Sequence, residues 1–201
     1  MSSRKAAAIL LCLALCGCAA VKSAEAPRVM RAAPVFTPAT PGTLVTSVAP
    51  VMARGTAAER RYAYIDRAAP REVLQAATLF WEEPPPRIVE RALVDGLRAL
   101  VGPAAGSDTT VNADQRVIAR LERFEEVTGG SLPAEAAVAI DVTVMNAERH
   151  IRLTGRYCGS APVASGEPSE RATAFEAALR QAVEALARDM RSGAGHASTP
   201  C

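Results

Sequence analysis

Apolar residues recur with a period of two in three consecutive segments of the second half of the chain, residues 116–124, 136–146 and 150–158. In the middle segment Val138, Ile140, Val142 and Val144 alternate with Asp141 and Thr143. Residues 128–133 and 146–149 make the two short joins. Alternating strands with short joins predict an antiparallel meander with one buried face.

Two other segments have the helical period instead. One helix is predicted to follow Pro84, Pro85 and Pro86, because proline is tolerated in the first helical turn. It should end at Gly102-Pro103. The second helix has one broad apolar stripe, made of Phe175, Leu179, Ala182, Val183, Leu186 and Met190.

Three earlier segments, 43–51, 60–66 and 71–81, have the composition of strands. Residues 103–115 are small and polar, which predicts a loop. The order is therefore strands, helix, three strands, helix. We predict an α+β fold in which an antiparallel or mixed sheet carries both amphipathic helices on one face.

Trp81 is the chain's only tryptophan, and it ends a predicted strand just before the three prolines. One hypothesis makes its indole a plug between helix and sheet, and the other makes it an anchor for a partner protein. We favour the plug, because a single aromatic residue at a junction of elements usually belongs to the core.

The N-terminus has the layout of a bacterial signal peptide. Arg4 and Lys5 precede an apolar run at 6–15, which is too short for the roughly 20 residues of a membrane-spanning helix. The run ends in "LCGC", which resembles the lipobox of bacterial lipoproteins. This resemblance implies a signal peptide at 1–17 and, at Cys18, a lipidated mature N-terminus carrying acyl chains such as palmitate. The alternative is an ordinary secretory signal cleaved near Ala19 or Ala20.

Four prolines at Pro27, Pro34, Pro38 and Pro41 interrupt the alanine-rich stretch after Cys18. We predict a lipid-anchored flexible tether over 18–42. The folded domain is then expected at 43–191 and a disordered tail at 192–201.

Charge and cysteine content limit the function classes. Removal of Arg4 and Lys5 with the signal leaves 21 of the 23 basic residues against 21 acidic ones. A mature chain without net charge lacks the electrostatic footprint of a nucleic-acid-binding protein. Cys158 and Cys201 remain besides Cys18. We expect no structural disulfide between them, although an oxidising compartment would permit one.

No catalytic constellation emerges from the motifs. His150 and Cys158 share a strand face, but eight residues of strand separate them by about 26 Å. His196 lies in the predicted tail. We find no nucleophile elbow, phosphate-binding loop or metal-ligand spacing. We therefore expect no catalytic residues, no metal and no cofactor, and predict that the protein is not an enzyme.

The lipobox, the proline-rich stretch and the segments "FWEEPPPRIVERALVDGLRALVG" and "RVIARLERFEE" together resemble the auxiliary lipoproteins of bacterial ABC-type transport systems. The resemblance covers about residues 43–190. The family's tryptophan followed by Glu/Asp-Pro-Pro is matched by Trp81, Glu83, Pro84 and Pro85. Its phenylalanine at the end of the first meander strand is matched by Phe124. These residues are candidates for structural or partner-contact roles.

The resemblance implies a non-enzymatic envelope protein that faces the periplasm. Its partners would be an MCE-domain protein and the permease and ATPase of a lipid transporter. The residue after Cys18 is alanine, which in the sorting rule of enteric bacteria favours the outer membrane. The alternative is a structural or assembly lipoprotein of the outer membrane, of the lipopolysaccharide-export or barrel-assembly type. The sequence does not name the lipid, and it leaves a homo-oligomer open.

Overall fold

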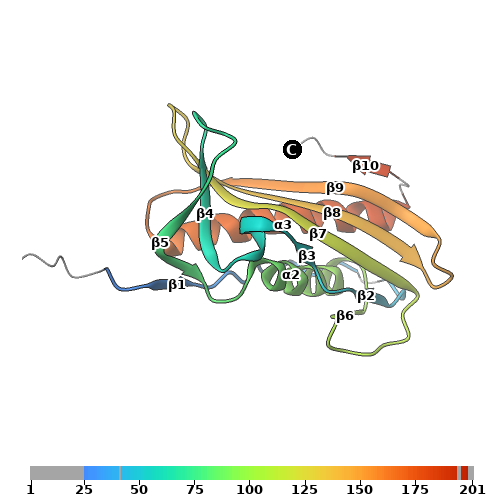
Figure 1. Ribbon diagram of the computed structural model, residues 1–201. Helices are drawn as coiled ribbons and strands as arrows, with labels where there is room; N and C mark the ends of the chain where they lie inside the picture. Colours follow the sequence, from blue (N-terminus) through green and yellow to red (C-terminus); the bar gives the residue numbers. More distant parts are fainter. Residues whose placement is uncertain (1–24, 41, 194–195, 199–201) are drawn as a thin grey trace, which may run out of the picture.

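The computed structural model describes residues 25–40, 42–193 and 196–198. In these residues ten strands form one mixed sheet, and two helices lie on one face of it (Figure 1). The predicted α+β class and the placement of both helices on the same side are confirmed.

The centre of the sheet is the predicted meander. It consists of β7 (Gln115–Thr128), β8 (Glu135–Asn146) and β9 (Ile151–Pro162), paired antiparallel in that order. The other edge of β7 pairs in parallel, in turn, with β2 (Thr46–Val48), β3 (Met52–Ala53) and β4 (Arg61–Asp66). A short 3₁₀ turn, η2 (Gly55–Ala58), links β3 to β4.

The remaining strands extend the sheet. β4 pairs antiparallel with β5 (Val73–Trp81), and β5 pairs in parallel with β1 (Arg28–Met30). β6 (Ala104–Ala105) pairs with β2, and β10 (His196–Ser198) pairs with β9, both in parallel.

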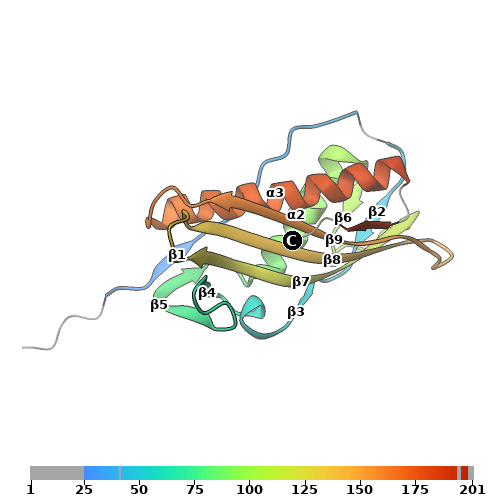
Figure 2. The ribbon, with the colours of Figure 1, turned by 90° about the horizontal axis from the view of Figure 1, so that it is seen from above.

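Helices α2 (Pro85–Leu100) and α3 (Pro168–Ser192) cover the inner face of the sheet (Figures 1 and 2). The predicted buried positions of β8 are confirmed, since Val138, Ile140, Val142 and Val144 are all buried beneath the helices while Asp141 is half-buried on the opposite face. The alternation is incomplete at the start of the strand, where Ala137 and Ala139 are buried as well. Among the described residues, no helix is both long and apolar enough to cross a bilayer.

Glycine permits the closest contact between the layers. A Cβ at Gly159 of β9 would lie 1.9 Å from the carbonyl oxygen of Ala178 in α3. Between the helices, a Cβ at Gly96 would meet Val183 Cγ1 at 2.4 Å. At Gly159 the strand thus approaches the helix backbone itself, and at Gly96 the missing side chain leaves room for Val183, so a larger residue would be obstructed at both positions.

The predicted tether over 18–42 is wrong for much of its length. Residues 28–30 form β1, and Met30, Ala32 and Phe36 are buried in the core. The segment after β1 lies along the helices, where the Ala39 amide donates to the Ala99 carbonyl at 2.9 Å. The prolines do not prevent this burial, because an extended edge segment needs few main-chain hydrogen bonds.

Smaller corrections concern the loops and the C-terminus. Of the predicted strand at 43–51 only 46–48 form a strand, β2, while β3 follows it at 52–53, and the predicted loop at 103–115 contains β6. The tail is not disordered throughout, since 196–198 form β10. Cys158 is disulfide-bonded, so the expectation that it takes part in no structural disulfide is wrong. Cys201 lies outside the described residues.

Candidate functional site

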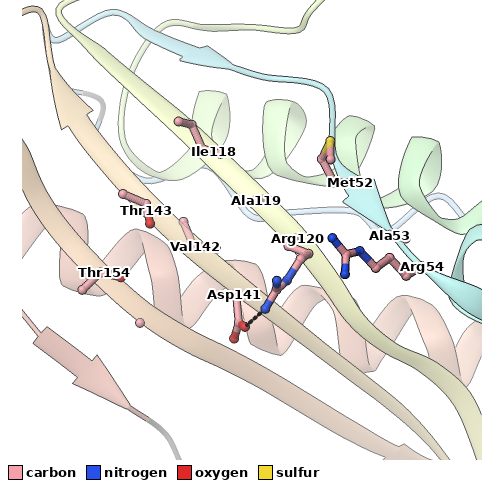
Figure 3. Close-up of a pocket in the computed structure, with 11 residues that line it drawn as sticks. Met52, Ala53, Arg54, Ile118, Ala119, Arg120, Asp141, Val142, Thr143 and Thr154 are labelled. Atoms are coloured by element: carbon pink, nitrogen blue, oxygen red, sulfur yellow. Dashed lines mark hydrogen bonds and ion pairs between the residues drawn. The ribbon is translucent and has the colours of Figure 1, made fainter. Parts of the chain in front are cut away.

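The face of the sheet opposite the helices carries a groove of about 690 Å³ (Figure 3). Its lining comes from residues 52–54 at β3, 118–120 of β7, 141–143 of β8 and 154–155 of β9. We call this the open-face groove. Because β7, β8 and β9 are adjacent, the register of the sheet alone places these residues together.

The register arranges the groove in two rows across the strands. In one row Ile118 lies opposite Thr143, which lies opposite Thr154. In the next row Arg120 lies opposite Asp141, which lies opposite Arg156. An apolar and hydroxyl row thus runs beside a charged row.

Asp141 is the centre of an ion network. Arg156 donates from Nε and Nη2 to its two oxygens at 2.6 and 2.9 Å, and Arg120 Nη2 donates at 3.2 Å. Arg120 also pairs with Glu122. The hydrogen bond from Arg156 is the largest cause that holds the pKa of Asp141 below its usual range. Asp141 is half-buried on the face opposite the helices, as its polar position in the alternation of residues 136–146 predicts.

The β3 side of the groove combines an apolar and a cationic residue. The Met52 side chain is 66% exposed, and Ile118 across the groove is 38% exposed. Figure 3 shows Arg54 reaching from the end of β3 toward the side where Arg120 lies. Among the described residues, no carboxylate forms an ion pair with Arg54.

The residues singled out from the sequence lie elsewhere: Trp81, Pro85 and Phe124 are buried, and Glu83 and Pro84 are half-buried. Trp81 is 1% exposed, and its ring packs edge-on against Phe124 and Phe175 at centroid distances of 5.2 and 5.0 Å. Tyr62 completes this aromatic cluster. The indole therefore has no surface to offer a partner, and its position is that of a plug between sheet and α3.

Pro84 and Pro85 form the corner between β5 and α2. Pro84 is the N-cap residue, with an extended backbone, and Pro85 is the first helical residue. The two glutamates before them pair with arginines rather than with the helix end. Glu82 accepts from Arg31 Nη2 at 2.7 Å, and Glu83 accepts from Arg91 at 2.7 Å. The corner thus fixes the N-terminal segment to the helix layer.

Buried polar groups in the core have structural partners. Glu126 is buried and accepts hydrogen bonds from Tyr62 and, at 2.9 Å, from Arg171. Burial is the largest cause that raises the pKa of Tyr62. A second buried carboxylate, Glu90, accepts from Arg87 at 3.1 Å and from Ser107.

Among the described residues, no group of three or more His, Cys, Asp or Glu side chains could hold a metal ion. Cys18 lies outside the described residues. The groove was not found by sequence reasoning. Its one signal was Asp141 within an apolar strand, whereas nothing in the local pattern marks Met52 or Arg54.

A family model described as "ABC-type transport auxiliary lipoprotein component" matches residues 30–191. No curated protein matches the chain. Among solved structures, a protein of Xanthomonas campestris described under family DUF330 is similar with a TM-score of 0.70 and 18% identity. The likeness covers 83% of this chain and 95% of that one. A second crystal structure gives a TM-score of 0.64 at 10% identity, over 81% of this chain and 99% of the other. Both likenesses bear on the fold alone.

Proposed function

This chain belongs to the family of ABC-type transport auxiliary lipoprotein components, and we propose that it serves an MCE-linked lipid transporter as a non-enzymatic, periplasm-facing partner. The observation that carries the proposal is the extent of the family match. It runs from the last residue of β1 to the penultimate residue of α3. The match therefore follows the whole domain and not a single short motif.

We further propose that Cys18 is the lipid anchor, because the "LCGC" sequence places a small residue and a cysteine directly after the apolar run. Two or three acyl chains would hold the protein on a membrane durably, whereas one would not. Ala19 after the anchor favours the outer membrane under the sorting rule of enteric bacteria.

The buried N-terminal segment shortens the reach of the domain. Nine residues, 19–27, separate Cys18 from the start of β1 at Arg28. Fully extended, they span at most about 30 Å at roughly 3.3 Å per residue. A tether over the whole of 18–42 would have allowed about 80 Å. The domain should therefore work close to the membrane that holds it, and the transporter should extend to meet it there.

A non-enzymatic role is consistent with the way the core uses its polar groups. The buried carboxylates of Glu90 and Glu126 are both engaged by hydrogen-bond donors within the fold. The protein would act by binding and positioning other components of the transport system.

The experiment that tests the partner is purification of the full chain, tagged at its C-terminus, from envelopes solubilised in mild detergent. We expect mass spectrometry to find an MCE-domain protein together with a permease and an ATPase. Recovery of barrel-assembly or lipopolysaccharide-export proteins in their place would support the alternative role and contradict the transporter.

Anchoring is tested separately by Cys18→Ser. Labelling with palmitate should be lost, and the protein should remain unprocessed or leave the membrane fraction. A Cys158→Ser variant is the matched control, because it removes a different cysteine and should keep the label. A Cys18→Ser protein that is processed normally and stays with the membranes would contradict the lipid anchor.

A further inference from the structure

We propose that the open-face groove binds one anionic amphiphile, a carboxylate or phosphate group carried on a single alkyl chain. The inference goes beyond the transport role, since it assigns a small-molecule site to a sheet face. It could fail while the MCE partnership stands, and the reverse also holds.

The apolar part of the groove calls for an apolar ligand. Met52 and Ile118 lie on the two sides of the groove and are 66% and 38% exposed. Most other large apolar side chains of the domain are buried in its core. Covering these two side chains with an alkyl chain removes apolar surface from water, which is favourable. The volume of about 690 Å³ lies within the range of roughly 300–1,000 Å³ that small-molecule sites occupy.

The charged part of the groove calls for an anion. The carboxylate of Asp141 is already paired with Arg120 and Arg156, so it is not left over to pair with another arginine of the groove. Arg54 reaches the same groove, and no carboxylate of the described residues pairs with it. A guanidinium matches a carboxylate or phosphate with two parallel hydrogen bonds. The head group of the ligand should therefore meet Arg54, with Arg120 beside it.

The sheet topology argues against a peptide strand as the occupant. An added strand needs a free sheet edge for its main-chain hydrogen bonds. The groove lies over the face of β7 and β8, and the edge of β7 is taken by β2, β3 and β4 in turn. A ligand there must bind through side chains alone, as an amphiphile can.

Methionine methyl groups give a local readout for the test. The complete mature chain, labelled with ¹³C at its methionine methyls, is held in zwitterionic nanodiscs and titrated with decanoate or decyl phosphate. We expect the Met52 signal to shift and saturate. Met30 is buried at 3% exposure in the core, so its signal should not move. Met52→Leu assigns the signal.

Neutral decanol and inorganic phosphate separate the two halves of the ligand. Decanol should bind at least about tenfold more weakly than decanoate, because a hydrogen bond to a charged group accounts for about a factor of ten or more. Inorganic phosphate alone should not shift the methyl signal of Met52. The decanoate and decyl phosphate arms tell which head group is preferred, and binding of either one supports the proposal.

Arg54→Gln should weaken anionic probe binding by about tenfold or more. Arg188→Gln is the matched control, because Arg188 is exposed on α3, in the layer on the other side of the sheet. The proposal is overturned if neither anionic probe moves Met52, if decanol binds as tightly as decanoate, or if the two arginine variants behave alike. It is also overturned if an acidic peptide shifts the Met52 signal while neither decanoate nor decyl phosphate does.

Discussion

Replacing Gly159 with alanine tests the closest contact between the sheet and its covering helix. The new Cβ would lie 1.9 Å from the carbonyl oxygen of Ala178, 2.7 Å from its carbonyl carbon and 3.1 Å from Gln181 Cβ. The obstacle is helix backbone, so no rotamer change can relieve the overlap. Helix α3 and strand β9 would have to separate by about 1 Å or more.

Overpacking of this kind costs about 1–3 kcal/mol, and a backbone obstacle places Gly159→Ala near the upper end. Alanine also restricts the unfolded chain, which returns about 0.4–1 kcal/mol. We therefore expect a net loss of about 2 kcal/mol of unfolding free energy. At about 2–4 °C per kcal/mol for a domain of this size, the melting temperature should fall by about 4–8 °C.

Thermal unfolding followed by circular dichroism measures this loss. Gly166→Ala is the matched control, because among the described residues, adjacent ones aside, its new Cβ would have only Arg171 Nη2 within 4 Å, at 4.0 Å. Gly96→Ala should fall between the two. Its Cβ would meet side chains and not backbone, Val183 Cγ1 at 2.4 Å and the Phe36 ring at 3.0 Å, and alanine favours a helix by about 1 kcal/mol. Equal melting of the Gly159 and Gly166 variants would refute the close packing of α3 on β9.

Three further outcomes follow from the core and the charged row. Trp81→Ala removes the centre of the aromatic cluster and should cost about 3–5 kcal/mol in urea unfolding; a variant with an unchanged midpoint would contradict the plug. The lowered pKa of Asp141 means that its carboxylate stabilises the fold fully above the unfolded value of 3.8, and that this contribution is lost as pH falls further. Asp141→Asn should therefore lower the urea midpoint at pH 7 and have a smaller effect near pH 2, and an equal effect at both would contradict the ion network. Cys158 should resist maleimide in the denatured, unreduced protein and react after reduction, whereas labelling before reduction would contradict the disulfide.

The local sequence pattern predicted those helices and strands in which buried and exposed residues follow a regular period. The alternation of β8 follows from a single buried face, and the start of α2 follows from the chemistry of Pro84 and Pro85. The N-terminal segment could not be found this way. Met30 and Phe36 each follow a valine, Val29 and Val35, in a stretch of prolines and alanines without a regular period. Only packing against β5 and the helices shows that Met30 and Phe36 belong to the core while the two valines are exposed.

The open-face groove depends on long-range pairing. Arg54 and Arg120 are far apart in the chain and meet because the two residues of β3 pair in parallel with β7 at Arg120 and Leu121. A strand of two residues has no periodic pattern to detect. The disulfide of Cys158 was missed for a related reason, since one cysteine at a strand position carries no information on its distance from another.

The most direct test of the transport role is photo-crosslinking in living cells, from exposed apolar positions on separate parts of the surface. Val35, Leu132 and Ile151 are suitable, because all three are well exposed and a crosslinker there disturbs no core contact. The account predicts that at least one position yields a crosslinked product containing an MCE-domain protein, and that Cys18→Ser abolishes the product. Products that contain only barrel-assembly or lipopolysaccharide-export proteins, or an MCE product that persists without Cys18, would contradict it.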